Sequence, residues 1–280
     1  MAEAKPSVAD EIERYLRTGE SDPYYSAWSG GFMECAQQAH EDLRGALIQE
    51  VHRLAEGGSH PLVPDMDMTA FTRGKVGPMV RGLFQRAEQD VVLGLLEKSV
   101  VFLTRETIGP VLANQAYGRS AWDLANLYLA SIGAELLDQS APRLQGISEG
   151  TMSYVSPEYF IEEDPFSDFI VHETAHIFHN CKRATIDLRE TRSKEWLLDI
   201  EFRKRETFAY SCEAYSRIVE RATSPTERRR EAKEYAGVVR IADERVDPAE
   251  VAEIVQAAAA ARNGWKVILE RCAPTRRLRT

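Results

Sequence analysis

The chain has 280 residues, of which 44% are hydrophobic and 28% charged, a composition too apolar for an intrinsically disordered chain. Its length suits one large domain or two modest ones. The net charge is −9 and uneven: residues 1–140 carry 12 basic and 20 acidic groups, residues 141–280 carry 23 and 24. Neither half is a basic surface, and the Arg runs at 228–230 and 276–279 are short, so we expect no nucleic-acid binding.

The sequence contains no recognisable export or membrane signal. Its first 15 residues lack the apolar core of a secretory signal, and no stretch reaches the about 18 apolar residues that span a bilayer. The four cysteines are scattered without a Cys-x-x-Cys pair, which does not favour a disulfide scaffold; they are Cys35, Cys181, Cys212 and Cys272. We therefore expect a cytoplasmic protein with reduced thiols and no membrane partner.

The first 57 residues are predicted to be helical. Apolar side chains recur there at the spacing of one helical face, and they are Phe32, Cys35, Ala39, Leu43, Leu47, Val51 and Leu54. Residues 56–67 are rich in Gly, Pro and Asp, which is typical of a loop and marks a soft boundary. A second helix is expected over about residues 75–98. We therefore predict a helical N-terminal region at residues 1–95, to which the sequence assigns no role.

The pattern changes at residue 99. Residues 99–104 (SVVFLT) form a short apolar, β-branched run that predicts a strand. A helix is expected over about 120–138, and residues 150–155 (GTMSYV) alternate like a strand. Later helices are expected to start at capping residues that directly precede a proline, namely Asp164, Ser224 and Asp247. The predicted fold class is mainly α with a small β element (α+β), with a second domain at residues 96–280.

The chemistry-bearing motif is His-Glu-Thr-Ala-His at residues 172–176. Residues four apart lie on one face of a helix, so His172 and His176 can grip one Zn²⁺ at about 2.0–2.1 Å each. Glu173 is next to the first histidine, and its carboxylate can reach water on the metal without being a ligand. Apolar neighbours can bury this helix in a core, and they are Phe166, Phe169, Ile170, Ile177 and Phe178. A buried helix that carries these polar groups needs partners for them, and a metal is one.

A zinc site needs a third protein ligand, commonly a carboxylate beside two histidines. Lys182 stands where the metzincin pattern has its third histidine, and His179 is too close in sequence to complete the site, so we expect His179 beside the ligands or in the core. The downstream segment RETFAYSCEAYSRI places Glu206, Tyr210 and Glu213 on one helical face. The apolar and aromatic residues among them are not typical of a solvated face, so at least one of these acidic groups should be buried and should pair with a cation. Both glutamates are candidates.

This combination resembles the gluzincin class of zinc metallopeptidases, the thermolysin-like class. The tetrapeptide Glu206-Thr207-Phe208-Ala209 is similar to the Glu-x-Phe-Ala segment of anthrax lethal factor and its relatives. The resemblance implies a zincin-like catalytic domain at residues 96–280 with Zn²⁺ as cofactor. It implies His172, His176 and Glu206 as ligands and Glu173 as general base, and Glu213 stays the alternative third ligand. The Asn and Asp of the thermolysin form are absent, because Arg205 and Tyr210 stand in their places.

The activity that the resemblance implies is hydrolysis of a peptide bond in a protein or peptide substrate. Zinc lowers the pKa of a bound water to about 7, and Glu173 takes the proton. The oxyanion needs a donor, for which Tyr210, Tyr154 and Tyr215 are candidates. Residues 151–155 are expected as the edge strand that aligns the substrate, or else as an ordinary core strand.

A second hypothesis from another class is a non-catalytic binding or regulatory protein with a structural or inactive zincin-like metal site. Glu173 favours the enzyme, because a purely structural zinc site does not need a glutamate beside its first ligand. Such a site also tends to close its fourth position with Cys or His.

Overall fold

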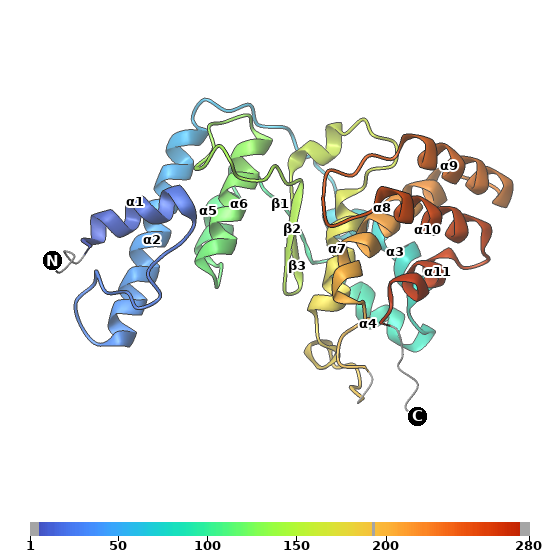
Figure 1. Ribbon diagram of the computed structural model, residues 1–280, viewed down its shortest axis with the longest axis horizontal. Coiled ribbons are helices and arrows are strands. Elements are labelled where there is room, and N and C mark those ends of the chain that lie inside the picture. The colour runs from blue at the N-terminus through green and yellow to red at the C-terminus, as the bar shows by residue number, and fades with distance from the viewer. Residues whose placement is uncertain (1–5, 192–193, 275–280) are drawn as a thin grey trace. The chain divides into compact units, whose positions relative to one another are not determined.

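The computed structural model describes residues 6–191 and 194–274, so the Arg run at 276–279 lies outside the described residues. Helices dominate and the one sheet is small, which confirms the predicted fold class, mainly α with a small β element (Figure 1). None of the helices in the described ranges combines the length and apolar character that crossing a bilayer requires.

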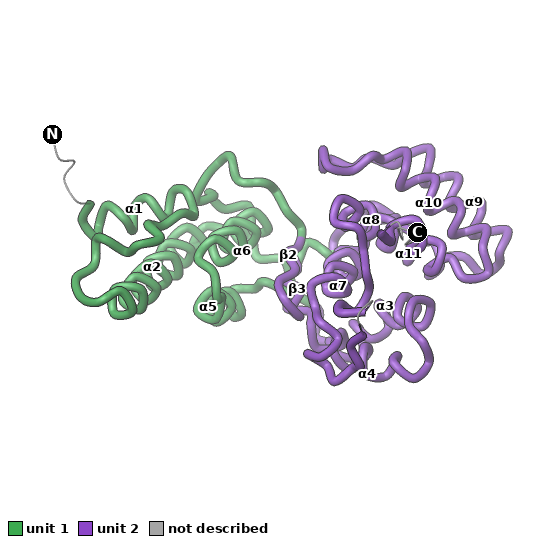
Figure 2. The backbone as a smooth tube through the Cα atoms, turned by 60° about the horizontal axis from the view of Figure 1, so that its bottom comes forward, with its two compact units in different colours: residues 1–63, 102–145, 156–160 green, residues 64–101, 146–155, 161–280 purple. Residues whose placement is uncertain are grey.

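Contacts divide the chain into two compact units (Figure 2). Unit 1 consists of Met1–Val63, Phe102–Gln145 and Ser156–Phe160. Unit 2 consists of Pro64–Val101, Gly146–Val155 and Ile161–Thr280. The units are interleaved along the chain. The functional division at residues 95 and 96 stays a prediction.

Unit 1 is built from helices α1 (Val8–Thr18), α2 (Phe32–Ala55), α5 (Ile108–Ala113) and α6 (Gly118–Ser131). As predicted, the buried face of α2 recurs every fourth residue, and it includes Ala39, Leu43, Leu47 and Val51. The prediction that the first 57 residues are helical is wrong between α1 and α2: α1 ends at Gly19, whose φ of 71° is the left-handed conformation that stops a helix. Phe32 is 60% exposed, because it lies at the first position of α2.

Unit 2 begins with two helices, α3 (Met68–Leu83) and α4 (Arg86–Leu96), where the sequence predicted one. The Asp67 side chain caps α3 by accepting from the Ala70 N–H, so this helix begins before residue 75. Phe84 adopts an extended backbone and breaks the run, with its ring 5.2 Å from that of Phe178. This aromatic contact favours the break over a continuous helix.

The sheet has the strand order β1-β3-β2, with β1 at Val100–Phe102, β2 at Gly146–Glu149 and β3 at Met152–Val155. β2 and β3 are antiparallel, with Gly146 opposite Val155, and the hairpin turns at Gly150, whose φ is 59°. The prediction of strands near residues 99–104 and 150–155 is confirmed. β3 is the middle strand, so its interpretation as the edge strand is wrong. Residues 146–149, which the sequence analysis did not single out, pair with β3 and form an edge.

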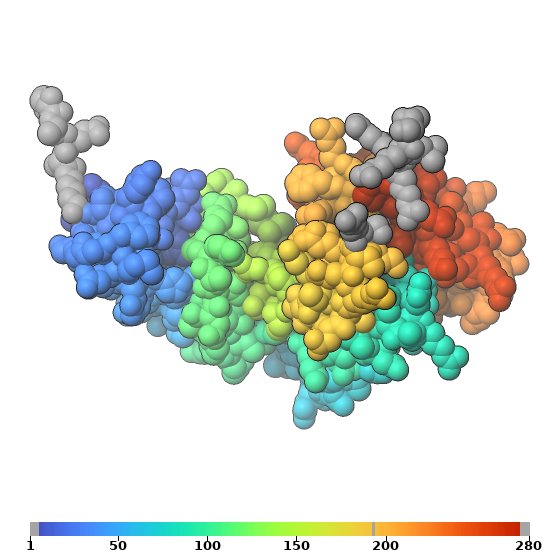
Figure 3. Space-filling model, turned by 90° about the horizontal axis from the view of Figure 1, so that it is seen from below, coloured from blue at the N-terminus to red at the C-terminus, as the bar shows by residue number. Residues whose placement is uncertain are grey.

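The remaining helices of unit 2 are α7 (Phe169–Asn180), α8 (Arg205–Arg221), α9 (Pro225–Val238), α10 (Pro248–Ala260) and α11 (Gly264–Cys272), with 3-10 turns η1 (Pro157–Ile161, mostly in unit 1), η2 (Arg183–Ile186) and η3 (Phe202–Lys204). The caps Ser224 and Asp247 are confirmed. Asp164 does not start α7, because its carboxylate accepts from the Phe166 N–H in a local turn. Figure 3 shows the segment of η2 (gold) beside α4 (teal), where Arg183 pairs with Glu88.

Candidate metal centre

Helix α7 presents its two motif histidines toward α8. Its N-cap is Asp168, which accepts from the Val171 N–H at 3.2 Å and is fully buried. Burial raises the pKa of this carboxyl, and Lys75 of α3 opposes the rise from 3.4 Å. The cap thus fixes the first turn of α7, and the histidines follow on the same face, four residues apart.

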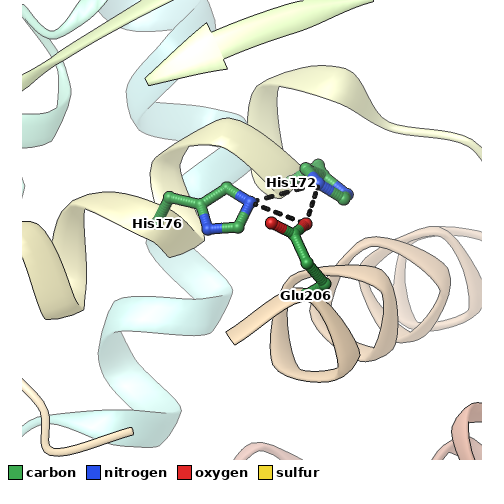
Figure 4. A group of neighbouring side chains, drawn as sticks. All are labelled: His172, His176 and Glu206. Atoms are coloured by element: carbon green, nitrogen blue, oxygen red, sulfur yellow. Dashed lines mark hydrogen bonds and ion pairs between the residues drawn. The ribbon is translucent and has the colours of Figure 1, made fainter. Parts of the chain in front are cut away.

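Glu206, in the first turn of α8, completes a group of three possible ligands (Figure 4). Nε2 of His172 lies 3.3 Å from Nε2 of His176. Oε2 of Glu206 lies 3.7 Å from the former and 3.3 Å from the latter. Ligands about 2.0–2.1 Å from a tetrahedral zinc ion are about 3.3–3.4 Å apart. The two nitrogens and one oxygen therefore fit the corners of a zinc site.

Glu213, the alternative third ligand, lies on the other side of the His172 ring. Its Oε2 is 2.9 Å from Nδ1 of His172. Its Oε1 accepts from the Asp168 N–H at 2.8 Å and from the Ser167 hydroxyl at 3.0 Å. A carboxylate at this nitrogen fixes the ring so that Nε2 faces the metal position and is more basic. The structure thus brings Glu206, and not Glu213, to the ligand position.

The electrostatics of the group favour a cation. Burial opposes a charge on His172, but hydrogen bonds to Glu206 and Glu213 outweigh it and raise its pKa to about 10. Burial also opposes a charge on Glu206, yet its contacts with both histidines hold its pKa well below the usual range. Two carboxylates therefore attract positive charge to the His172 ring. A metal ion can supply the same positive charge after the imidazole has lost its proton.

Glu173, the predicted base, is 7% exposed, and its side chain lies against Gly146 of β2. Burial raises its pKa, while the neighbouring histidines and a hydrogen bond with Ser148 of β2 oppose the rise. Gly146 of β2 lies so close that a Cβ there would be 2.5 Å from Cγ of Glu173. Glycine at this point lets the strand approach Glu173, because any larger residue would displace the Glu173 side chain. The sequence analysis missed both β2 residues, since nothing local links them to the motif.

Tyr210 and His179 each contact one of the histidines. The ring of Tyr210 stands edge-on to His172, with centroids 4.5 Å apart. Burial and the carboxylates of Glu213 and Asp243 raise the pKa of its phenol, which stays protonated. Nε2 of His179 lies 3.4 Å from Nδ1 of His176, and burial lowers the pKa of His179 to about 3, so its ring is neutral. His179 therefore lies beside the proposed ligand His176, which is one of the two positions predicted for it.

The other two tyrosine candidates occupy different surroundings. Tyr215 is buried against Trp265 of α11, with ring centroids 4.8 Å apart. Tyr154 lies on β3 opposite Ile147. Of the three candidates, Tyr210 is the one whose ring contacts a motif histidine in the described part of the chain.

A further charged pair, at residues 243 and 245, reaches the site from the loop between α9 and α10. The Arg245 guanidinium lies 3.2 Å from Oε1 of Glu206. Asp243 binds the same guanidinium. The sequence analysis did not identify this pair, because two charged residues in a polar loop carry no distinguishing pattern.

Comparisons with known proteins provide no family assignment. A scan of protein-family models, a search of curated proteins and a search of solved structures each returned no match.

Proposed function

We propose that this chain is a zinc-dependent metallopeptidase of gluzincin type, with His172, His176 and Glu206 as the ligands. The observation that carries the proposal is the convergence of their three donor atoms, within 4.8 Å of one another, beside Glu173. Two histidines and a carboxylate form a common ligand set of catalytic zinc sites, which keep a fourth position open. In the described ranges, no fourth His, Cys, Asp or Glu joins this group, as it would in a closed structural site.

Zn²⁺ held by these ligands would supply a Lewis acid that polarises the scissile carbonyl and acidifies water. Glu173 is the residue to which we assign proton transfer. Its raised pKa makes it a better proton acceptor than an exposed glutamate, and it can return the proton to the leaving amine. Tyr210 is the donor that we assign to the developing oxyanion, because its phenol keeps its proton.

The edge strand β2 supports a peptide as the substrate. It forms one edge of the sheet and carries Gly146 directly against Glu173. An extended peptide that adds to this edge gains backbone hydrogen bonds that do not depend on its sequence. Such a peptide would run past the proposed base. The role first expected for residues 151–155 is therefore proposed for residues 146–149.

The metal site is tested by zinc content, measured by mass spectrometry on protein purified without chelator. We expect about one zinc per chain in the wild type and none in Glu206→Ala, since two protein ligands remain. Glu213→Ala should keep zinc but bind it about 10–100-fold more weakly, because His172 loses its orienting partner. Zinc lost in Glu213→Ala and kept in Glu206→Ala would contradict the ligand assignment. A wild type without zinc, even after reconstitution, would end the metallopeptidase proposal.

The activity is tested separately with a quenched fluorescent peptide library, using Glu173→Gln as the matched control. This isosteric variant should keep its zinc and lose about 10²–10⁴-fold in hydrolysis rate, because only proton transfer is removed. The alternative function, a non-catalytic binding or regulatory protein with a zincin-like site, predicts a different result. There the wild type and Glu173→Gln would both hold zinc and neither would cleave any peptide.

A further inference from the structure

The loop between α9 and α10 contains a pair of charged residues with defined geometry. The carboxylate of Asp243 accepts from Nε of Arg245 through both oxygens, at 2.9 and 3.0 Å. It also accepts from the backbone N–H of Arg245 at 2.9 Å. A guanidinium bound through its fork and its own backbone is limited to few orientations. Nη2 of Arg245 also donates to Asp243, at 2.5 Å, so the pair holds Nη2 in a fixed direction.

That direction is toward the metal ligand Glu206. One of its oxygens, Oε2, faces the two histidines, and the other, Oε1, lies 3.2 Å from the Arg245 guanidinium. The two oxygens thus have different partners. We propose that Arg245 is a positioning residue that holds Oε1 of Glu206 and so restricts this ligand to binding the metal through Oε2 alone. This inference rests on the proposed zinc site.

Asp243 also offsets the repulsion between the Arg245 guanidinium and a bound metal ion. A guanidinium near a divalent cation repels it and competes for the charge of the ligand. Asp243 carries a compensating charge, and its side chain is 15% exposed where that of Arg245 is 72% exposed. The pair is therefore close to neutral toward the metal while it keeps the ion pair with Glu206. Asp243 orients Arg245, which orients Glu206.

A role in folding alone would give a different signature. Exposed ion pairs contribute little to folding stability, and Arg245 is largely exposed. Removing its side chain should therefore leave the metal-free protein as stable as before. The constraint should become measurable only when a metal binds, because only then does the orientation of Glu206 matter.

The test uses the full-length chain and measures zinc affinity by competition with a chromophoric chelator. Arg245→Ala should weaken zinc binding about 10–100-fold, the usual effect of losing a partner of a metal ligand. Asp243→Asn should also weaken it, since the guanidinium then keeps its charge and loses its orientation. Arg240→Ala is the matched control: it removes the same charge from the same loop, and the guanidinium of Arg240 donates to the neighbouring Val239 carbonyl. We expect wild-type affinity for it.

Cobalt substitution provides a readout that a folding role would not change. With Oε1 released in Arg245→Ala, both oxygens of Glu206 can bind, so the Co²⁺ d–d bands should weaken as the coordination number rises. Wild-type affinity and an unchanged spectrum in Arg245→Ala would overturn the inference and leave the proposed site intact. Equal loss in Arg240→Ala would also overturn it, because the effect would then be general charge. Failure of the wild type to bind zinc would overturn the proposed function itself.

Discussion

Glu206 and Glu213 lie on the same face of one helix, yet each acquires its role from a different neighbour. Glu206 faces Nε2 of both motif histidines, whereas Glu213 contacts Nδ1 of His172 and is held by the Asp168 backbone N–H. The two residues are seven positions apart, about two helical turns. Their carboxylates therefore meet different nitrogens of the His172 ring, Nε2 for Glu206 and Nδ1 for Glu213. Both residues are glutamates on the same face of α8, so the helical pattern does not distinguish them. Their contacts decide which one is proposed as a ligand and which one as its support.

A pH-dependent stability is expected at Tyr15 in unit 1. Burial raises the pKa of Tyr15 to about 12, and its hydroxyl donates to the Gly118 carbonyl at 2.7 Å. The unfolded chain has a tyrosine pKa of about 10, so the folded state binds this proton more tightly. The stabilisation is complete below pH 10 and is lost as the pH rises from about 10 to 12.

Tyr15→Phe should therefore be about 1 kcal/mol less stable than the wild type at pH 8, because the hydrogen bond is lost. At pH 11 the wild type should no longer be the more stable of the two proteins, since it then loses about 1.4 kcal/mol of stability through the ionisation of the unfolded tyrosine. Urea unfolding at both pH values measures the difference. Tyr24→Phe, at a position that is 78% exposed, serves as the control and should show no gap at either pH. The same stability difference between the wild type and Tyr15→Phe at both pH values would contradict the expected effect of Tyr15 ionisation.

At the scale of elements, the site depends on how closely α7 approaches the edge strand β2. The strand can lie against Glu173 because Gly146 has no side chain. The same strand is paired with β3 through a hairpin, so the position of Gly146 is set by the sheet and that of Glu173 by the helix. Neither element defines the surroundings of the proposed base without the other.

Gly146→Ala should displace Glu173, because the added methyl would lie 2.5 Å from its Cγ. We expect peptide hydrolysis to fall by at least about tenfold, since proton transfer depends on the placement of the base. Zinc content should stay at the wild-type level, because Glu173 is not among the proposed ligands. Gly237→Ala, on α9 where a Cβ would meet nothing within 4 Å, should have wild-type activity. Normal activity in Gly146→Ala would mean that the position of Glu173 does not limit the reaction.

At the scale of the whole molecule, every residue assigned to the metal centre belongs to unit 2. The ligands are on α7 and α8, the base faces β2, and the Asp243–Arg245 pair follows α9. Unit 1 has its own buried core along α2. A ligand stabilises the part of the protein that must be folded to bind it.

Zinc should therefore raise the stability of unit 2 and leave that of unit 1 unchanged. At a free concentration about 1,000 times the Kd, the gain is about 4 kcal/mol. Fluorine NMR of protein labelled with 5-fluorotryptophan can follow both units during thermal unfolding, because Trp28 and Trp122 lie in unit 1 and Trp196 and Trp265 in unit 2. Chelation should lower the midpoint reported by Trp265, which packs on Tyr215 of α8. A common shift of all four signals would show instead that the units unfold together.

Local patterns determined much of this protein. Helical spacing predicted the face shared by His172 and His176 and the buried stripe of α2, and the sequence of caps before prolines correctly predicted two helix starts. These features depend on residues within a few turns of one another, where the backbone alone sets the geometry. Packing between distant segments decided the rest: the break at Phe84, the approach of Gly146 to Glu173, and the approach of Arg245 to Glu206. Such contacts join residues tens of positions apart, and they follow from how whole elements bury their surfaces together, which no local period encodes.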